Sequence, residues 1–95
     1  MAGYVIVDVD VHDTEAYGEY RKLVAPTIEK YGGRYIVRGG ANEVMEGDWT
    51  PSRVVVLEFD SVARAKEWYN SEEYAPALAI RLKAATSSLI IVEGA

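Results

Sequence analysis

The sequence predicts an α+β fold in which a four-stranded antiparallel sheet carries helices on one face. Three observations lead to this prediction. The chain has 95 residues, the length of one domain spanning residues 1–95. Stretches rich in β-branched residues alternate with helical stripes in the order β-α-β-β-α-β. The two halves also echo each other, since Val5–Asp10 resembles Val55–Asp60 and Tyr35–Gly39 resembles Ile90–Gly94.

The first half supplies a strand, a helix and a second strand. Tyr4–Val11 is rich in β-branched residues and alternates with Asp toward its end, as a strand does. Asp13 is a suitable helix cap. An apolar stripe at helical spacing follows, formed by Tyr17, Tyr20, Val24, Ile28 and Tyr31. Pro26 is expected to kink this helix, and Gly32–Gly33 ends it. Arg34–Arg38 is the second strand, and Gly39–Gly40 lets the backbone bend after it.

The second half repeats this order after the turn-rich loop Gly47–Pro51. Arg53–Phe59 is the third strand. Asp60–Ser61 caps a helix through Tyr69, and Ser71 restarts a helix. Ser88–Glu93 is the fourth strand. The whole order fits the split βαβ, ferredoxin-like arrangement, with strand order 4-1-3-2.

Composition excludes several classes of partner and site. The net charge is −5, and no cluster of Lys or Arg provides the footprint that a nucleic acid or an anionic membrane needs. The chain has no cysteine, which removes disulfides, thiolate metal sites and a Cys nucleophile. No apolar run reaches membrane-spanning length, so a cytoplasmic location is the default expectation.

Side-chain alternation divides the predicted sheet into two faces. The purely hydrophobic set is expected under the helices: Val5, Val7, Val9, Tyr35, Val37, Val55, Leu57, Phe59, Ile90 and Val92. The opposite face then carries one aliphatic and one charged residue per strand: Ile6, Asp8, Ile36, Arg38, Val56, Glu58, Ile91 and Glu93. This mixed face is too apolar for open water and too charged for a dry core.

A second copy of the chain resolves this conflict. Two sheets packed face to face bury the aliphatic residues and enclose the charges, and burial of about 400 Å² of apolar surface per subunit gives on the order of 10 kcal/mol before association costs. We therefore expect a homodimer with a polar cavity between its sheets. The alternative is a monomer with a solvated outer face.

Two charged residues of this face, Arg38 and Asp8, are expected at one end of the sheet. The guanidinium of Arg38 suits a carboxylate or phosphate ligand, or simply an acidic neighbour. Asp8 is a polar partner for such a ligand.

His12 is the only histidine, and it continues the alternation of Asp8 and Asp10. It suits a general base near neutral pH, but a solvated position beside the cap at Asp13 is the simpler explanation. The Asp-x-Asp-x-His spacing is not specific for a metal, so no metal site is predicted.

Other candidates lie at the far end of the sheet and on the second helical segment. Glu58 is expected to face Glu93 across one strand, where paired carboxylates suit acid–base work or meet cations. Trp49 in the loop is a lid or dimer anchor. Tyr69, Tyr74 and Arg81 are expected either to pack in the core or to line a pocket.

Four stretches, YGGRYIVRGG (31–40), EGDWTPSRVVVLEF (46–59), AKEWYNSEEY (65–74) and the ending IIVEG, resemble the domain of unknown function 1330 family. The resemblance covers nearly the whole chain. It implies the dimeric α/β-barrel superfamily, whose ferredoxin-like subunits pair through their sheets and which includes cofactor-independent monooxygenases and isomerases. It implies no catalytic residues.

The expected function is binding of a small, anionic or oxygenated organic molecule between the paired sheets. In this scheme Arg38 orients the ligand, Asp8 or Glu58 assists and His12 accepts a proton, without a cofactor. Whether turnover follows stays open. The rival hypothesis is a non-catalytic dimer whose charged residues only satisfy one another.

Overall fold

The computed structural model describes residues 1–95, which form four strands and three helices. The elements in chain order are β1 (Gly3–Val11), α1 (Thr14–Lys30), β2 (Arg34–Arg38), β3 (Val54–Phe59), α2 (Val62–Tyr69), α3 (Ala75–Ala84) and β4 (Ala85–Glu93). The strands form one antiparallel sheet in the order β2-β3-β1-β4, as the ferredoxin-like prediction requires. None of the three helices combines the length and hydropathy that crossing a bilayer requires.

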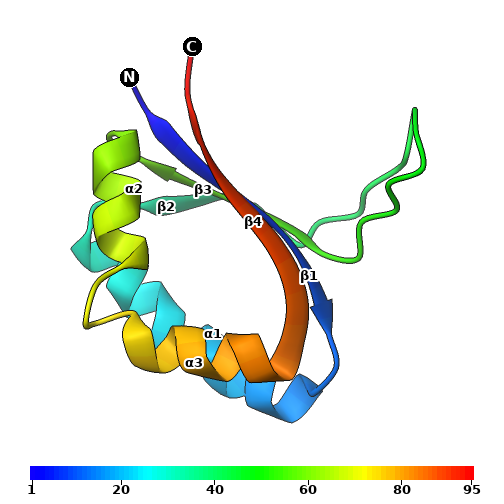
Figure 1. Cartoon of the computed structure of the whole chain (residues 1–95), viewed down its shortest axis with the longest axis horizontal. Coiled ribbons are helices and arrows are strands. Elements are labelled where there is room, and N and C mark those ends of the chain that lie inside the picture. Colours follow the sequence, from blue (N-terminus) through cyan, green and yellow to red (C-terminus); the bar gives the residue numbers. More distant parts are fainter.

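The sheet curls around the helices and leaves its other face uncovered (Figure 1). α1 packs on α3, whereas α2 lies against β1, β3 and β4. The two chain ends meet at one edge, where the backbone N–H of Gly94 donates to the carbonyl of Ala2 at 2.8 Å. Residues 39–53 leave the body as a protruding loop without regular secondary structure. We call this segment the arm.

The core lies between the sheet and the helices. Val5, Val7 and Val9 of β1 are buried there, as are Val55, Leu57 and Phe59 of β3. Trp68 and Tyr74 are the largest fully buried side chains, and their ring centroids lie 4.2 Å apart. The helix-facing assignment of β1 and β3 from alternation is therefore confirmed.

A β-bulge in β2 reverses the prediction for its last residues. Tyr35 pairs with Leu57, but both Ile36 and Val37 lie opposite Val56, and Arg38 then pairs with Val55. Because a bulge inserts one extra residue, every side chain after it changes face. Arg38 thus lies on the helix-covered face, and Val37 lies on the uncovered face. The expectation for both residues was wrong.

β4 also presents the face opposite to the one expected. Its register pairs Val5 with Ile91 and Val7 with Leu89, so Leu89 and Ile91 lie under the helices. Ile90 and Val92 point outward and are 58% and 41% exposed. The echo between β2 and β4 was out of phase by one residue, and with a side-chain period of two such an error inverts a whole strand.

Two helix boundaries follow from local hydrogen bonds. The Asp13 carboxylate accepts from the backbone N–H of Ala16 at 3.0 Å and starts α1, as predicted. The Ser71 hydroxyl instead donates to the carbonyl of Trp68 and accepts from the N–H of Tyr74, which makes a turn. α3 therefore starts at Ala75 rather than Ser71, and Pro76 sits in its first turn, where a missing N–H costs nothing.

The uncovered face, hereafter the outer face, has an apolar centre. Ile6 pairs with Val56 on one side and with Ile90 on the other, and Val37 and Val92 extend this surface. Glu58 lies at its edge, where it forms an ion pair with Arg34 and accepts a 3.0 Å hydrogen bond from the Tyr4 hydroxyl.

Candidate functional site

A cavity lies between α1 and the sheet, inside one chain. Seventeen residues from all four strands and all three helical regions line it, and thirteen of them are hydrophobic. Its volume is about 30 Å³, which is room for about two water molecules. A larger ligand therefore has to displace side chains at the edge of the cavity.

The polar lining is entirely cationic or hydroxylic. Four of the chain's six arginines line the cavity: Arg21, Arg38, Arg53 and Arg81. No Asp or Glu lines it, although the chain has fifteen acidic residues. The other two arginines, Arg34 and Arg64, each have a carboxylate partner, whereas none of the four in the cavity does. Four guanidinium groups without a counter-ion are the strongest electrostatic feature of this protein.

Arg81 is the deepest of the four and is only 3% exposed. Its Nη1 donates to the Ser87 hydroxyl, and its Nε lies 3.4 Å from the Tyr74 hydroxyl. Burial tends to lower the pKa of Arg81, but the neighbouring Tyr74 outweighs it and raises that pKa, so the group stays charged. A guanidinium has five N–H donors, and these two contacts leave the remainder free for a ligand.

Arg53 enters from the start of β3 and is held by its surroundings. Its backbone N–H points at the Asp8 carboxylate at 3.3 Å, and its carbonyl accepts from Val9 at 2.9 Å. The guanidinium packs on Gly39, where a Cβ would approach Nη1 to 2.2 Å. Gly39 also has φ +71°, a conformation that favours glycine. The Arg53 Nε is buried without a hydrogen-bond partner.

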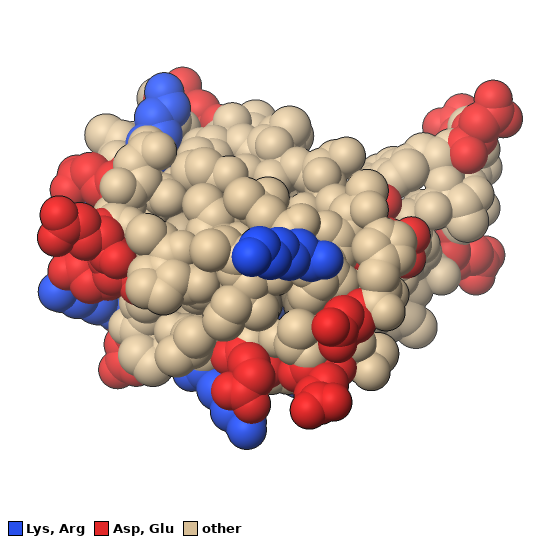
Figure 2. All heavy atoms as spheres, turned by 60° about the horizontal axis from the view of Figure 1, so that its bottom comes forward, with Lys and Arg blue, Asp and Glu red and all other residues tan.

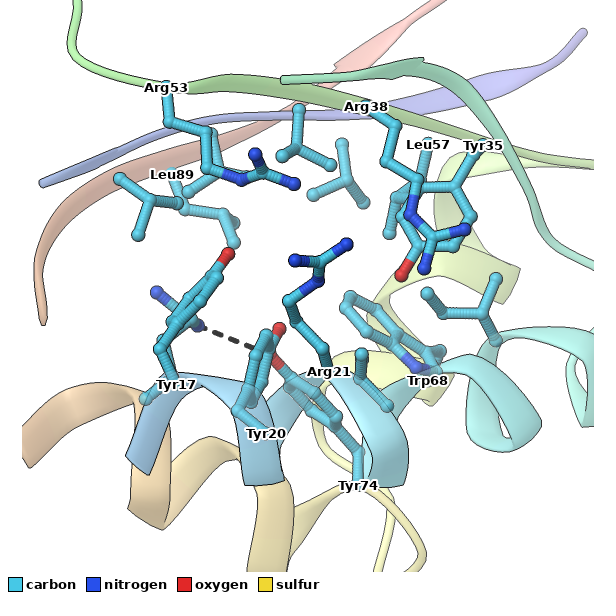
Figure 3. Close-up of a pocket in the computed structure, with 17 residues that line it drawn as sticks. Tyr17, Tyr20, Arg21, Tyr35, Arg38, Arg53, Leu57, Trp68, Tyr74 and Leu89 are labelled. Atoms are coloured by element: carbon cyan, nitrogen blue, oxygen red, sulfur yellow. Dashed lines mark hydrogen bonds between the residues drawn. The ribbon is translucent and has the colours of Figure 1, made fainter. Parts of the chain in front are cut away.

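Arg21 and Arg38 form the solvent side of the cavity. Both are exposed, and Figure 3 shows Arg21 rising from α1 toward Arg53 while Arg38 lies beside Tyr35. The Arg38 guanidinium stands 4.2 Å from the centroid of the Tyr35 ring.

Tyrosine hydroxyls also line the cavity. The hydroxyl oxygens of Tyr20 and Tyr74 lie 3.0 Å apart inside the core. Burial and the neighbouring Tyr74 raise the pKa of Tyr20 far above its ordinary value, and burial raises the pKa of Tyr35. Trp68 Nε1 is already satisfied by the Thr27 hydroxyl at 3.0 Å. The cavity therefore offers cations and neutral O–H groups, the partners of an anion.

The structure brings together three of the residues singled out from the sequence: Arg38, Tyr74 and Arg81 line the cavity. Tyr69 lies outside it, in a groove beside β4. His12 is exposed at the opposite end of β1 and contacts the Thr86 hydroxyl at 2.6 Å. Glu58 lies on the outer face. Glu93 pairs with Gly3, on the helix side, so the expected pair of carboxylates does not form.

Asp8 and Trp49 form a separate contact that holds the arm. Asp8 accepts from Trp49 Nε1 at 3.1 Å and from the backbone N–H groups of Ser52 and Arg53. Partial burial tends to raise the pKa of Asp8, but these hydrogen bonds outweigh it and hold that pKa below its ordinary value. The carboxylate is thus occupied by the chain itself.

Sequence reasoning missed Arg21 and Arg53. A signal for each was present. Arg53 shares its alternation with Val55 and Leu57, which places it on the helix side of β3, and Arg21 follows Tyr17 at the i+4 spacing of the buried stripe. For metals the result is negative, since no group of three or more His, Asp or Glu side chains could hold an ion.

The exterior has the opposite charge character to the cavity. Figure 2 shows acidic side chains around the rim of the helical side and on the end of the arm. The arm itself carries the exposed acids Glu43, Glu46 and Asp48.

Comparison with solved structures shows the same fold in proteins of different description. A protein of unknown function from Rhodopseudomonas palustris is 24% identical, with a TM-score of 0.79 over 99% of this chain and 82% of that one. SnoaB, a cofactor-independent oxygenase from Streptomyces nogalater, is 9% identical, with a TM-score of 0.67 over 99% and 93%. A dimeric ferredoxin-like protein of unknown function from Jannaschia sp. CCS1 is 11% identical, with a TM-score of 0.72 over 99% and 100%.

No curated protein matches the chain. One family model does, along residues 2–95, and the expectation from the sequence is thereby confirmed: the chain belongs to the family described as Domain of unknown function (DUF1330).

Proposed function

We propose that this protein binds a small organic anion whose charged group is held by the arginines that line the cavity between α1 and the sheet. The observation that carries the proposal is the convergence of four arginines without a carboxylate partner, one of them 3% exposed. An unpaired buried charge costs several kcal/mol, so a chain that keeps one gains something from it. A bound carboxylate supplies the missing negative charge and pairs well with the planar guanidinium fork. The hydrophobic lining favours an organic anion over an inorganic one.

The test compares a matched pair of probes, benzoate and benzamide, which differ in charge but hardly in shape. At ten times its Kd, benzoate raises the free energy of unfolding by about 1.4 kcal/mol and Tm by roughly 6–11 °C. Benzamide has little effect. An equal response to both probes would overturn the proposal.

Two substitutions separate ligand binding from structural pairing. We expect Arg81→Met to abolish the benzoate response while the Tm of the ligand-free protein is unchanged or higher, because an unpaired buried charge is replaced by an apolar chain. Arg64→Met is the matched control, since Arg64 pairs with Glu67 outside the cavity. If Arg81→Met lowers Tm and leaves the benzoate response intact, Arg81 is only structural.

The binding unit is proposed to be a homodimer formed through the outer face. The apolar centre around Ile6, Val56 and Ile90 is left uncovered in a single chain, and the Jannaschia protein of the same fold is dimeric. Packing two such faces together buries this surface and leaves each cavity inside its own subunit. The proposed ligand site thus differs from the inter-sheet position expected from the sequence, because Arg38 lies on the other side of the sheet.

A second candidate function is cofactor-independent catalysis, as an oxygenase or isomerase. The observation that favours it is the fold shared with SnoaB, together with the donors Tyr20 and Tyr74 beside Arg81. Such an array stabilises negative charge that develops on a bound substrate. The test is turnover of phenolic and enolisable acids by metal-free protein, followed by oxygen uptake and by proton exchange. Binding without either signal would leave the protein a non-catalytic binder.

A further inference from the structure

We propose that the bound anion is a carboxylic acid with an unbranched apolar chain, whose carboxylate meets Arg81 and whose chain lies in the groove beside β4. This inference rests on the proposed function, because it uses the deepest cation of the same cavity. It adds the chemical class of the ligand and the place of its apolar part.

The groove adjoins the cavity, since Arg81 belongs to the lining of both. It is formed between α2, α3 and β4, has a volume of about 490 Å³, and is lined by Lys66, Tyr69, Arg81, Leu82, Leu89 and Ile91, with Ser87. This volume is within the range of about 300–1,000 Å³ typical of small-molecule sites, whereas the cavity itself holds only about two waters. The body of an organic ligand therefore fits the groove, and only a small head group fits the cavity.

Two residues connect the two spaces. Arg81 and Leu89 line both of them. Arg81 holds its guanidinium through Ser87 on the groove side and Tyr74 on the cavity side, so a carboxylate can reach it from the groove.

The remaining groove residues fit a chain that follows such a head. Leu82, Leu89 and Ile91 provide apolar contact, and Leu82 is 62% exposed in the empty groove. The charged residues of the groove, Lys66 and Arg81, are both cationic, and no acid lies among them. Charge complementarity therefore selects an acid, and the apolar wall selects a chain over a compact polar body.

The experiment measures the affinity of acetate, hexanoate and decanoate by calorimetry, with the acids kept below their micellar concentrations. Burial of a methylene contributes about 0.8 kcal/mol, which is about fourfold in Kd per carbon. We expect Kd to fall by about this factor per carbon until the groove is filled. Decanol, which has the chain but no carboxylate, should bind far more weakly than decanoate.

A charge placed in the groove provides the second arm. Leu82→Asp should remove the dependence of affinity on chain length. Leu23→Asp is the matched control, because Leu23 is an exposed leucine on α1 outside the groove. Both positions are on the surface, so both variants should fold.

The outcomes separate this inference from the proposed function. If benzoate and acetate bind but affinity does not rise with chain length, the inference is wrong and the anion site stands. If affinity rises with chain length and Leu82→Asp has no effect, the chain lies elsewhere and the inference is again wrong. If no acid of any length binds, the proposed function itself fails.

Discussion

At the scale of single residues, Asp8 shows that the position of a charged side chain decides its role. It lies on the outer side of β1, yet its carboxylate is bound to three donors from the arm, at Trp49, Ser52 and Arg53. Through its hydrogen bond to the backbone N–H of Arg53, Asp8 fixes the start of β3. It thereby fixes the point from which the Arg53 side chain extends into the cavity. Asp8 is a positioning residue for the anion site rather than a group that touches the ligand.

We predict that Asp8→Ala lowers the stability of the protein by about 1–2 kcal/mol, because two backbone donors and the Trp49 indole lose their acceptor. Benzoate binding should weaken as well, through the loss of order at Arg53. The emission of Trp49 should shift to longer wavelength, measured in a Trp68→Phe background to isolate it. Asp10→Ala is the control, since Asp10 is exposed and no side-chain hydrogen bond engages it. A native benzoate affinity in Asp8→Ala would remove the positioning role.

The pKa of Asp8 sets the pH at which this contribution disappears. A lowered pKa means that the folded state favours the ionised form, so the stabilisation is full above the ordinary carboxyl pKa of about 3.9. It is lost as pH falls through the still lower pKa of the folded state. The difference in free energy of unfolding between the native chain and Asp8→Ala should therefore be constant near neutrality and shrink below about pH 4.

At the scale of elements, the β-bulge in β2 decides which residues face the anion site. Without it, simple alternation would put Arg38 on the outer face beside Val56, as the sequence suggested. The additional residue at Ile36–Val37 turns Arg38 toward the helices, where it meets Tyr35 and the cavity. A single backbone irregularity thereby adds one of the four cations.

We predict that deletion of Ile36 removes the bulge and keeps Arg38 on the helix side, because Val37 already lies opposite Val56 and Arg38 opposite Val55. β2 is an edge strand, so the rest of the sheet retains its pairing. Benzoate affinity should therefore stay close to that of the native chain, whereas Arg38→Ala should weaken it. Calorimetry of the two variants tests this. A loss of affinity on deletion as large as that of Arg38→Ala would contradict the assigned register.

At the scale of the whole molecule, the acidic side chains and the arginines of the cavity occupy different regions. Acidic side chains lie on the surface, four arginines line the cavity with Arg81 buried at its base, and an apolar sheet face is left without a cover. A domain of 95 residues buries a smaller fraction of its surface than a larger domain does, so covering this face adds stability that the single chain lacks. The proposed homodimer makes use of this face, and each anion site stays within one subunit.

We predict that Ile90→Lys converts the dimer to a monomer in sedimentation velocity. Because a twofold interface repeats each substitution, the dimer would bury two unpaired charges. Burying them costs several kcal/mol, which raises the dissociation constant of the dimer at least about 100-fold. Leu23→Lys, at an exposed aliphatic position on α1, should leave the mass unchanged. A native chain that sediments as a monomer at micromolar concentration would contradict the dimer.

The sequence alone determined the elements and their order. β-branched alternation, the cap at Asp13 and the stripe from Tyr17 to Ile28 are local signals, and each acts within a few residues of chain. The helix-facing sides of β1 and β3 followed from the same alternation, since both strands are regular. The family could also be identified, because its motifs are continuous stretches of sequence.

The tertiary structure alone decided the register of β4, the bulge in β2 and hence the composition of the site. Register depends on which residues meet across strands, and one residue of slip exchanges the two faces. Alternation therefore assigned the wrong side of the sheet to Ile90, Ile91 and Arg38. Nor did it show that the Asp8 carboxylate is occupied by Trp49 of the arm. The four arginines of the cavity are up to sixty residues apart in the chain. They become neighbours only when the sheet curls over α1. The pairing of distant strands brings them together, and no local sequence pattern encodes that pairing.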